Sequence, residues 1–191
     1  MRPIVFIIVT LFIVSLSAAQ PFGFIEGMTY DELKKIDPEI EHLSDDLYLT
    51  KAPTPSPIFN LYAVRIHKTE GLYLVKVVMY IETNVFGTAL KSSYKEIVNG
   101  IRGKYGEPTA NHDFLISGSI WDEPEDYMMS LLKEERYLLT EWNIKDIEAG
   151  GLNKILLNAT ASSTNKGTIL VEYHFGDFDK LLKDGKEKTQ W

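Results

Sequence analysis

Residues 88–105 read TALKSSYKEIVNGIRGKY and carry the most regular helical pattern in the chain. Their apolar residues recur mostly at steps of three and four, which places them on one face of a helix. That face consists of Leu90, Tyr94, Ile97, Val98, Ile101 and Tyr105. Gly106 and Pro108 follow this stretch and end the helix. We expect the long helix to cover the apolar face of a sheet.

Five other stretches alternate apolar and polar residues, as strands with one buried face do. They are residues 58–67, 72–82, 137–144, 154–163 and 168–175. Their apolar positions require an even-numbered loop at 68–71 and an odd-numbered loop at 165–167, and the second loop places Glu172 opposite Thr160. A shorter helix starts near Pro124. We therefore predict an α+β fold, with an antiparallel sheet of about five strands that carries the long helix and the shorter helices on one face.

The N-terminal residues 1–19 have the pattern of a secretory signal peptide. Arg2 precedes an apolar run of about a dozen residues, and small residues at Ser17 and Ala19 form a cleavage site before Gln20. An uncleaved anchor would need about 20 apolar residues to cross the bilayer. We therefore expect an exported protein, periplasmic or extracellular, with no membrane span after cleavage.

Residues 20–191 have the length of a single domain. A capping box at Thr29 starts a helix over residues 30–36. The proline-rich segment 51–57 is an extended connector, which we expect to run along the surface of the domain. The charged tail 183–191 is expected to be frayed.

Composition excludes several classes of function. The chain has 20 Lys and Arg against 27 Asp and Glu, a formal net charge of -7, which does not suit nucleic-acid binding. It has no cysteine, which excludes disulfides, thiolate metal sites, cysteine nucleophiles and a lipid-carrying cysteine. No phosphate-binding glycine loop or dinucleotide motif is present, and we expect no cofactor. An acidic surface instead suits encounter with a basic protein partner.

The densest polar cluster is the run of four carboxylates in residues 122–126, which two tryptophans flank along the chain. Exposed aromatic residues next to such a cluster would mark a binding surface. The candidate binding residues are Trp121, Asp122, Glu123, Glu125, Asp126 and Trp142. The acids could instead complement the dipole of the helix that follows, with Asp122 and Glu125 as a capping box. They lack the spacing of a calcium loop, and we predict no metal site.

No residue pattern points to catalysis. The four histidines, which share no metal-ligand spacing, are His42, His67, His112 and His174. His174 and Glu172 lie on one strand face, where exposed strand polarity explains them. Residues 117–119 read Ser-Gly-Ser and lack the glycines of a nucleophile elbow. The sequence therefore predicts no catalytic residue and favours a non-enzymatic protein.

Residues 27–33 read Gly-Met-Thr-Tyr-Asp-Glu-Leu. This stretch resembles the Gly-Met-(Ser/Thr)-x-x-(Glu/Gln)-(Leu/Val) opening of small bacterial envelope proteins. Examples are the small lipoprotein of the outer-membrane β-barrel assembly machine and the β-lactamase-inhibitor-like folds. In those families a glycine turn leads into a short helix packed on an antiparallel sheet, and the proteins act by binding other proteins. The resemblance implies a soluble, exported, non-enzymatic protein, although this chain has no cysteine to carry a lipid.

Three functions remain open on the sequence alone. The leading one is an exported, non-catalytic module that binds another protein, as an inhibitor, an immunity protein or an envelope accessory protein would. A small-ligand carrier would require an apolar pocket between the long helix and the sheet. A hydrolase would require the carboxylates near Asp122 to meet His112 in a crevice.

Overall fold

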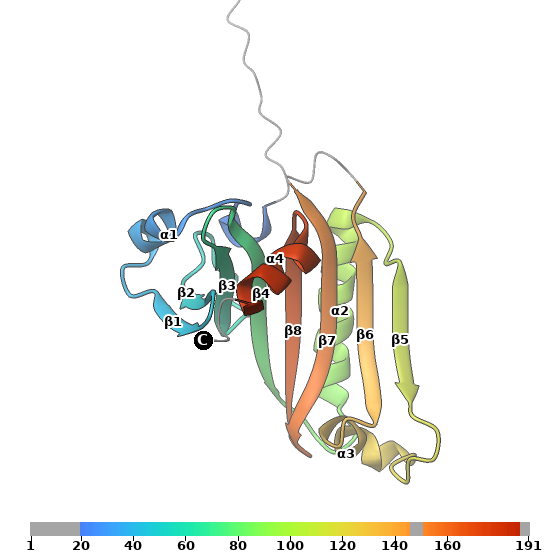
Figure 1. Cartoon of the computed structure of the whole chain (residues 1–191). Helices are drawn as coiled ribbons and strands as arrows, with labels where there is room; N and C mark the ends of the chain where they lie inside the picture. Colours follow the sequence, from blue (N-terminus) through green and yellow to red (C-terminus); the bar gives the residue numbers. More distant parts are fainter. Residues whose placement is uncertain (1–19, 146–150, 188–191) are drawn as a thin grey trace, which may run out of the picture.

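One eight-stranded antiparallel sheet forms the centre of the computed structural model, which describes residues 20–145 and 151–187 (Figure 1). The strand order is β1-β2-β3-β4-β8-β7-β6-β5. The strands are β1 (Glu41–Ser44), β2 (Leu47–Thr50), β3 (Leu61–His67), β4 (Gly71–Glu82), β5 (Ala110–Leu115), β6 (Arg136–Asn143), β7 (Leu152–Ser163) and β8 (Lys166–Phe175). The α-helices are α1 (Tyr30–Ile36), α2 (Thr88–Tyr105), α3 (Tyr127–Leu132) and α4 (Phe178–Glu187). Two short 3₁₀ turns are η1 (Pro21–Gly23) and η2 (Pro124–Asp126).

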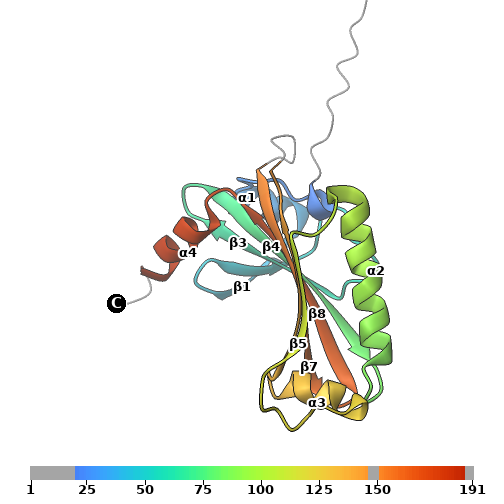
Figure 2. The ribbon, with the colours of Figure 1, turned by 90° about the vertical axis from the view of Figure 1, so that its right-hand side faces the viewer.

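The predicted fold class is wrong in two respects. The sheet has eight strands rather than about five, because β1, β2 and β5 were not predicted. Helices also lie on both faces of the sheet rather than on one, with α2 on one side and α4 on the other (Figure 2). All four residues of β1 are exposed, as are the four central residues of β5, so neither strand carries the apolar alternation that marks a buried face.

The helix α2 begins and ends at the residues predicted from its apolar stripe. Its buried residues, Leu90, Tyr94, Ile97 and Ile101, belong to the main hydrophobic core. Gly87 lies at the N-terminal end with a positive φ of 66°, a conformation that favours glycine. The core therefore lies between α2 and the sheet face that α2 covers.

The two predicted hairpins differ in how well their strand pairing was predicted. In β3 and β4, Val64 pairs with Val75 as predicted, but the predicted loop at 68–71 is wrong: Gly71 belongs to β4 and pairs with His67. A shift in the pairing between Arg65 and Ile66 restores the predicted pairs. In β7 and β8, the apolar residues face inward as expected, but Glu172 pairs with Leu156 rather than with Thr160. The pairing is thus shifted by four residues along β7, and the predicted loop at 165–167 is wrong because β8 already begins at Lys166. Every side chain nevertheless keeps its face, since the shift is even.

A second, smaller core lies on the opposite face of the sheet. It contains Tyr73, Leu74 and Leu181, with Phe178 packed against them. Phe178 and Leu181 belong to α4, which extends to Glu187 and so includes part of the segment 183–191 predicted to be frayed. The expected signal peptide at 1–19 and the last residues, 188–191, lie outside the described residues. Of the helices that are described, none is long and apolar enough to cross a membrane.

Candidate protein-binding site

The acidic cluster predicted from the sequence lies at one end of the sheet, on the loop and the turn η2 that connect β5 to α3. Asp122, Glu123 and Glu125 are exposed, whereas Asp126 and Trp121 are half-buried. Glu123, not Asp122, caps η2, and its side chain makes no capping hydrogen bond. The predicted capping box is therefore absent, and the exposed carboxylates form an acidic surface.

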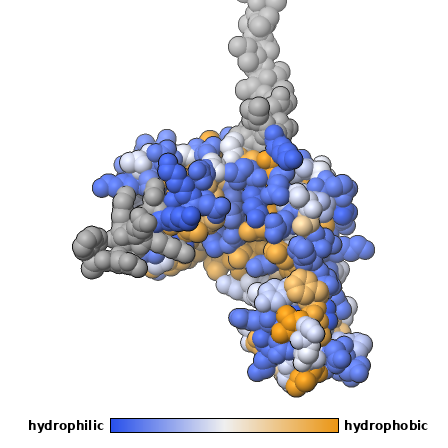
Figure 3. All heavy atoms as spheres, turned by 45° about the vertical axis from the view of Figure 1, so that its right-hand side comes forward, coloured by the Kyte–Doolittle hydropathy of each residue, from blue (hydrophilic) through white to orange (hydrophobic). Residues whose placement is uncertain are grey.

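An exposed apolar patch lies on the same connection and on the adjacent strand ends. We call it the tip patch; its residues and exposed fractions are Phe114 (48%), Ile116 (40%), Ile120 (76%) and Tyr137 (47%). The rings of Phe114 and Tyr137 are stacked, with centroids 5.2 Å apart. Figure 3 shows hydrophobic atoms gathered among hydrophilic ones at this end of the molecule. Exposed apolar surface with a polar border is typical of a protein-binding site.

Arg136 holds this end of the sheet together. Its guanidinium forms an ion pair with Asp113 at 2.9 Å and donates a hydrogen bond to the Ser130 hydroxyl at 3.1 Å. It also lies 4.8 Å from the ring centroid of Tyr127, and the Lys91 ammonium lies 4.3 Å from the same centroid. One side chain on β6 thus contacts β5 and α3, which positions the loop that carries the tip patch.

The two tryptophans predicted to flank the binding surface have different surroundings. Trp121 is half-buried, and its backbone N–H donates to the Ser119 hydroxyl at 3.1 Å. Trp142 is 1% exposed, and its indole N–H donates to the Gly106 carbonyl at 3.0 Å. Trp142 is therefore a core residue that fastens the end of α2 to β6. The structure does not bring it to the acidic surface.

The residues considered for hydrolysis do not meet in a crevice. Asp122, Glu123 and Glu125 are exposed, and His112 is exposed on β5 with its ring 6.3 Å from the ring of Phe114. Within residues 20–145 and 151–187, no three His, Asp or Glu side chains come together as a metal site would require. The geometry gives the acidic cluster no catalytic arrangement.

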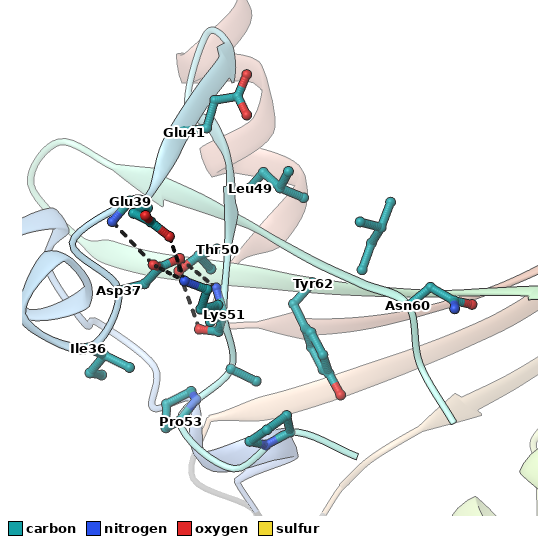
Figure 4. Close-up of a pocket in the computed structure, with 13 residues that line it drawn as sticks. Ile36, Asp37, Glu39, Glu41, Leu49, Thr50, Lys51, Pro53, Asn60 and Tyr62 are labelled. Carbon is teal, nitrogen blue, oxygen red and sulfur yellow. Dashed lines mark hydrogen bonds and ion pairs between the residues drawn. The ribbon is translucent and has the colours of Figure 1, made fainter. Parts of the chain in front are cut away.

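A groove of about 620 Å³ that the sequence did not reveal lies where α1, β2 and the start of β3 meet (Figure 4). Asp37 is buried there and accepts hydrogen bonds from the backbone N–H groups of Lys51, at 2.8 Å, and Glu39, at 3.2 Å. Burial raises the pKa of Asp37, but these hydrogen bonds and the Lys51 charge outweigh it and hold the pKa below its usual value. Figure 4 shows Asn60 and Tyr62 apart from this group. Asp37 thus holds the chain that follows α1 against the residue that follows β2, and its carboxylate is not free to bind a ligand.

A smaller pocket of about 250 Å³ lies between α2 and the sheet. Apolar and aromatic side chains dominate its lining, which includes Ile58, Phe59, Met79, Ile97, Ile101 and Tyr173. A pocket in this position is the feature that a small-ligand carrier requires. Its volume is below the range of about 300–1,000 Å³ that is usual for ligand sites.

A buried charged group lies beneath α4 on the opposite face of the sheet. His174 is 4% exposed and contacts the ring of Phe178, so it is not an exposed strand residue as the sequence suggested. Its Nε2 lies 2.9 Å from Glu172, which also accepts a hydrogen bond from the Lys76 ammonium. Burial raises the pKa of Glu172, but its bonds to His174 and Lys76 and their charges outweigh burial and lower the pKa to about 2.

Stability at acid pH tests this charged group. The depressed pKa means that the carboxylate of Glu172 stabilises the folded protein above about pH 4.5, and this contribution is lost as the pH falls towards 2. We expect the free energy of unfolding to fall across this window by about 2–3 kcal/mol more in the wild type than in Glu172→Gln. Urea unfolding between pH 2 and 6 measures it, with the exposed Glu82→Gln as the control. Equal slopes for the wild type and Glu172→Gln would contradict the assignment.

Comparison of the chain with family models, curated proteins and solved structures finds no match.

Proposed function

We propose that this protein is an exported, non-catalytic module that binds another protein through the tip patch and the acidic surface beside it. The observation that carries the proposal is that four exposed apolar side chains lie on the connection from β5 to α3 and on the adjacent strand ends, and that the same connection carries the exposed carboxylates of Asp122, Glu123 and Glu125. Apolar side chains would supply the affinity of such a contact, and the carboxylates would select a basic partner. Export is supported by the signal-peptide pattern of residues 1–19.

The alternative of a small-ligand carrier has one observation in its favour, the apolar pocket between α2 and the sheet. The pocket is small for such a role, and Ile58 at its mouth is 48% exposed. The tip patch offers a larger set of exposed apolar side chains with charged neighbours. Protein binding is therefore the better-supported function.

The proposal predicts that changing the tip patch removes a partner. Ile120 is 76% exposed, so Ile120→Ser removes apolar contact surface without creating a cavity. We expect at least one protein from extracts of the producing cells to bind the immobilised wild type about tenfold or more better than this variant, which corresponds to about 1.4 kcal/mol. Quantitative mass spectrometry of the bound fractions measures the ratio.

Leu43→Ser is the matched control, because Leu43 is an exposed apolar residue on β1 at the other edge of the sheet. It should retain the same proteins as the wild type. The association rate constant of a captured partner should also fall as salt is raised, since attraction between exposed charges is screened. If no bound protein distinguishes Ile120→Ser from Leu43→Ser, the tip patch is not the binding surface.

A further inference from the structure

The strand β5 presents a free edge of the sheet. Within the described residues it pairs with β6 alone, and the pairing runs through six residues without a shift. The N–H of Ile116 donates to the Glu135 carbonyl at 2.8 Å, in the same register, so the even-numbered residues of β5 bond to β6. The strand residues whose N–H and C=O groups point away from the sheet are Asn111, Asp113 and Leu115.

The opposite edge of the sheet is built differently. The strand β1 has only four residues, and its pairing with β2 shifts between His42 and Ser44. Short and bulged edges are a common protection against pairing with another chain. The strand β5 is longer and its pairing is regular, so it is the edge that can accept a further strand.

The charges along this edge indicate what kind of strand it would accept. Residues 107–126 contain six acids and no Lys or Arg. The acids are Glu107, Asp113, Asp122, Glu123, Glu125 and Asp126. On β5 itself, Asp113 is directed to the α2 side, where it meets Arg136, and Phe114 is directed to the opposite side, within the tip patch. A strand beside β5 would therefore meet a carboxylate on one face and aromatic surface on the other.

We propose that β5 binds an extended segment of a partner protein, which joins the sheet as a further strand and has alternating basic and apolar residues. Its backbone would bond to the free groups of Asn111, Asp113 and Leu115, the mode known as β-strand addition. A second copy of this chain is a poorer occupant, because it would bring another acidic 107–126 segment against the first. The inference rests on the proposed function and specifies how the partner is recognised.

A proline at position 113 separates backbone recognition from side-chain effects. The N–H of Asp113 bonds to no strand of the sheet, and edge strands tolerate proline, so Asp113→Pro should fold. Asp113→Ala is the matched control: it removes the same carboxylate but keeps the N–H. The probe is an end-capped octapeptide of alternating Lys and Val, compared with the block peptide of four Lys followed by four Val.

We expect isothermal titration calorimetry to show the alternating peptide binding wild type and Asp113→Ala, with Asp113→Pro about tenfold or more weaker than Asp113→Ala. Amide exchange of Asn111, Asp113 and Leu115 in the wild type should slow when the peptide is added. If Asp113→Pro does not fold, the alternating peptide with every amide N-methylated replaces it as the test, and it should lose binding to the wild type.

Several results would overturn the inference. They are equal binding by Asp113→Pro and Asp113→Ala, equal binding of the alternating and block peptides, and no binding of the alternating peptide at all. Concentration-dependent dimerisation of the wild type that Asp113→Pro abolishes would instead assign the edge to a second copy. In each case, loss of a captured partner on Ile120→Ser would still support the tip patch, so failure of strand addition is distinguishable from failure of the proposed function.

Discussion

Gly71→Ala is expected to lower the free energy of unfolding by at least about 3 kcal/mol. Gly71 has a φ of +74°, and a Cβ built on it would lie 2.1 Å from the carbonyl oxygen of Gly27. The two backbone segments cannot separate easily, because Gly27 N–H donates to the Leu72 carbonyl at 2.9 Å and Leu72 N–H donates to the Met28 carbonyl at 2.8 Å. The substitution would therefore detach the N-terminal segment from the start of β4. Chemical denaturation measures the loss.

Gly103→Ala is the control for this prediction. Gly103 lies within α2, and a Cβ there would meet nothing within 4 Å. Alanine has the higher helix propensity, so this variant should be more stable than the wild type by up to about 1 kcal/mol. A Gly71→Ala protein within about 0.5 kcal/mol of the wild type would show that the two segments are not packed as described.

Trp142→Ala is expected to destabilise the protein by about 3–5 kcal/mol, the usual cost of truncating a large buried side chain. The indole is 1% exposed and its N–H satisfies the Gly106 carbonyl next to the end of α2. Trp142→Phe should lose less stability, because phenylalanine keeps most of the ring volume. Its remaining loss includes the hydrogen bond of the indole, which is worth about 1 kcal/mol. Urea unfolding of the three proteins gives the ranking.

Trp121→Ala is the comparison that separates the two tryptophans predicted from the sequence. Trp121 is half-buried on the loop that carries the tip patch, so its removal should cost less stability than removal of Trp142. It should instead weaken capture of the partner lost on Ile120→Ser. A smaller loss of stability for Trp142→Ala than for Trp121→Ala would contradict the placement of the two side chains.

The periodic parts of the fold were predictable because the spacing of apolar residues along one helix or strand indicates which of its faces is buried. The stripe of α2 gave the bounds of the helix, and the alternation in β3, β4, β7 and β8 gave most of the buried faces, since side chains that leave water recur at the period of the element. Tyr73 is an exception, because the alternation places it with Val75 but it packs in the second core on the opposite face. The pairing of β7 with β8 was missed because a shift of four residues, like any even shift, leaves every side chain on the same face.

The candidate site was only partly predictable. The acidic residues Asp122 to Asp126 are adjacent in the chain, so the sequence showed them together, and the structure confirms that Asp122, Glu123 and Glu125 are exposed. The tip patch gave no such signal, because Phe114, Ile116 and Tyr137 resemble ordinary core residues in a sequence. Only their position at one end of the sheet, on β5, on the connection that follows it and on the adjacent β6, leaves them exposed.

The sequence by itself determined the long helix, the inward faces of the central strands and the acidic character of the chain, because these depend on residues that are neighbours along one element. The tertiary structure decided the strands β1, β2 and β5, the burial of Trp142 and the position of α4 on the opposite face. Exposed edge strands have no buried face to impose a pattern, and they form because the sheet offers them hydrogen-bond partners. The binding surface proposed for this protein exists because the sheet leaves β5 at its edge.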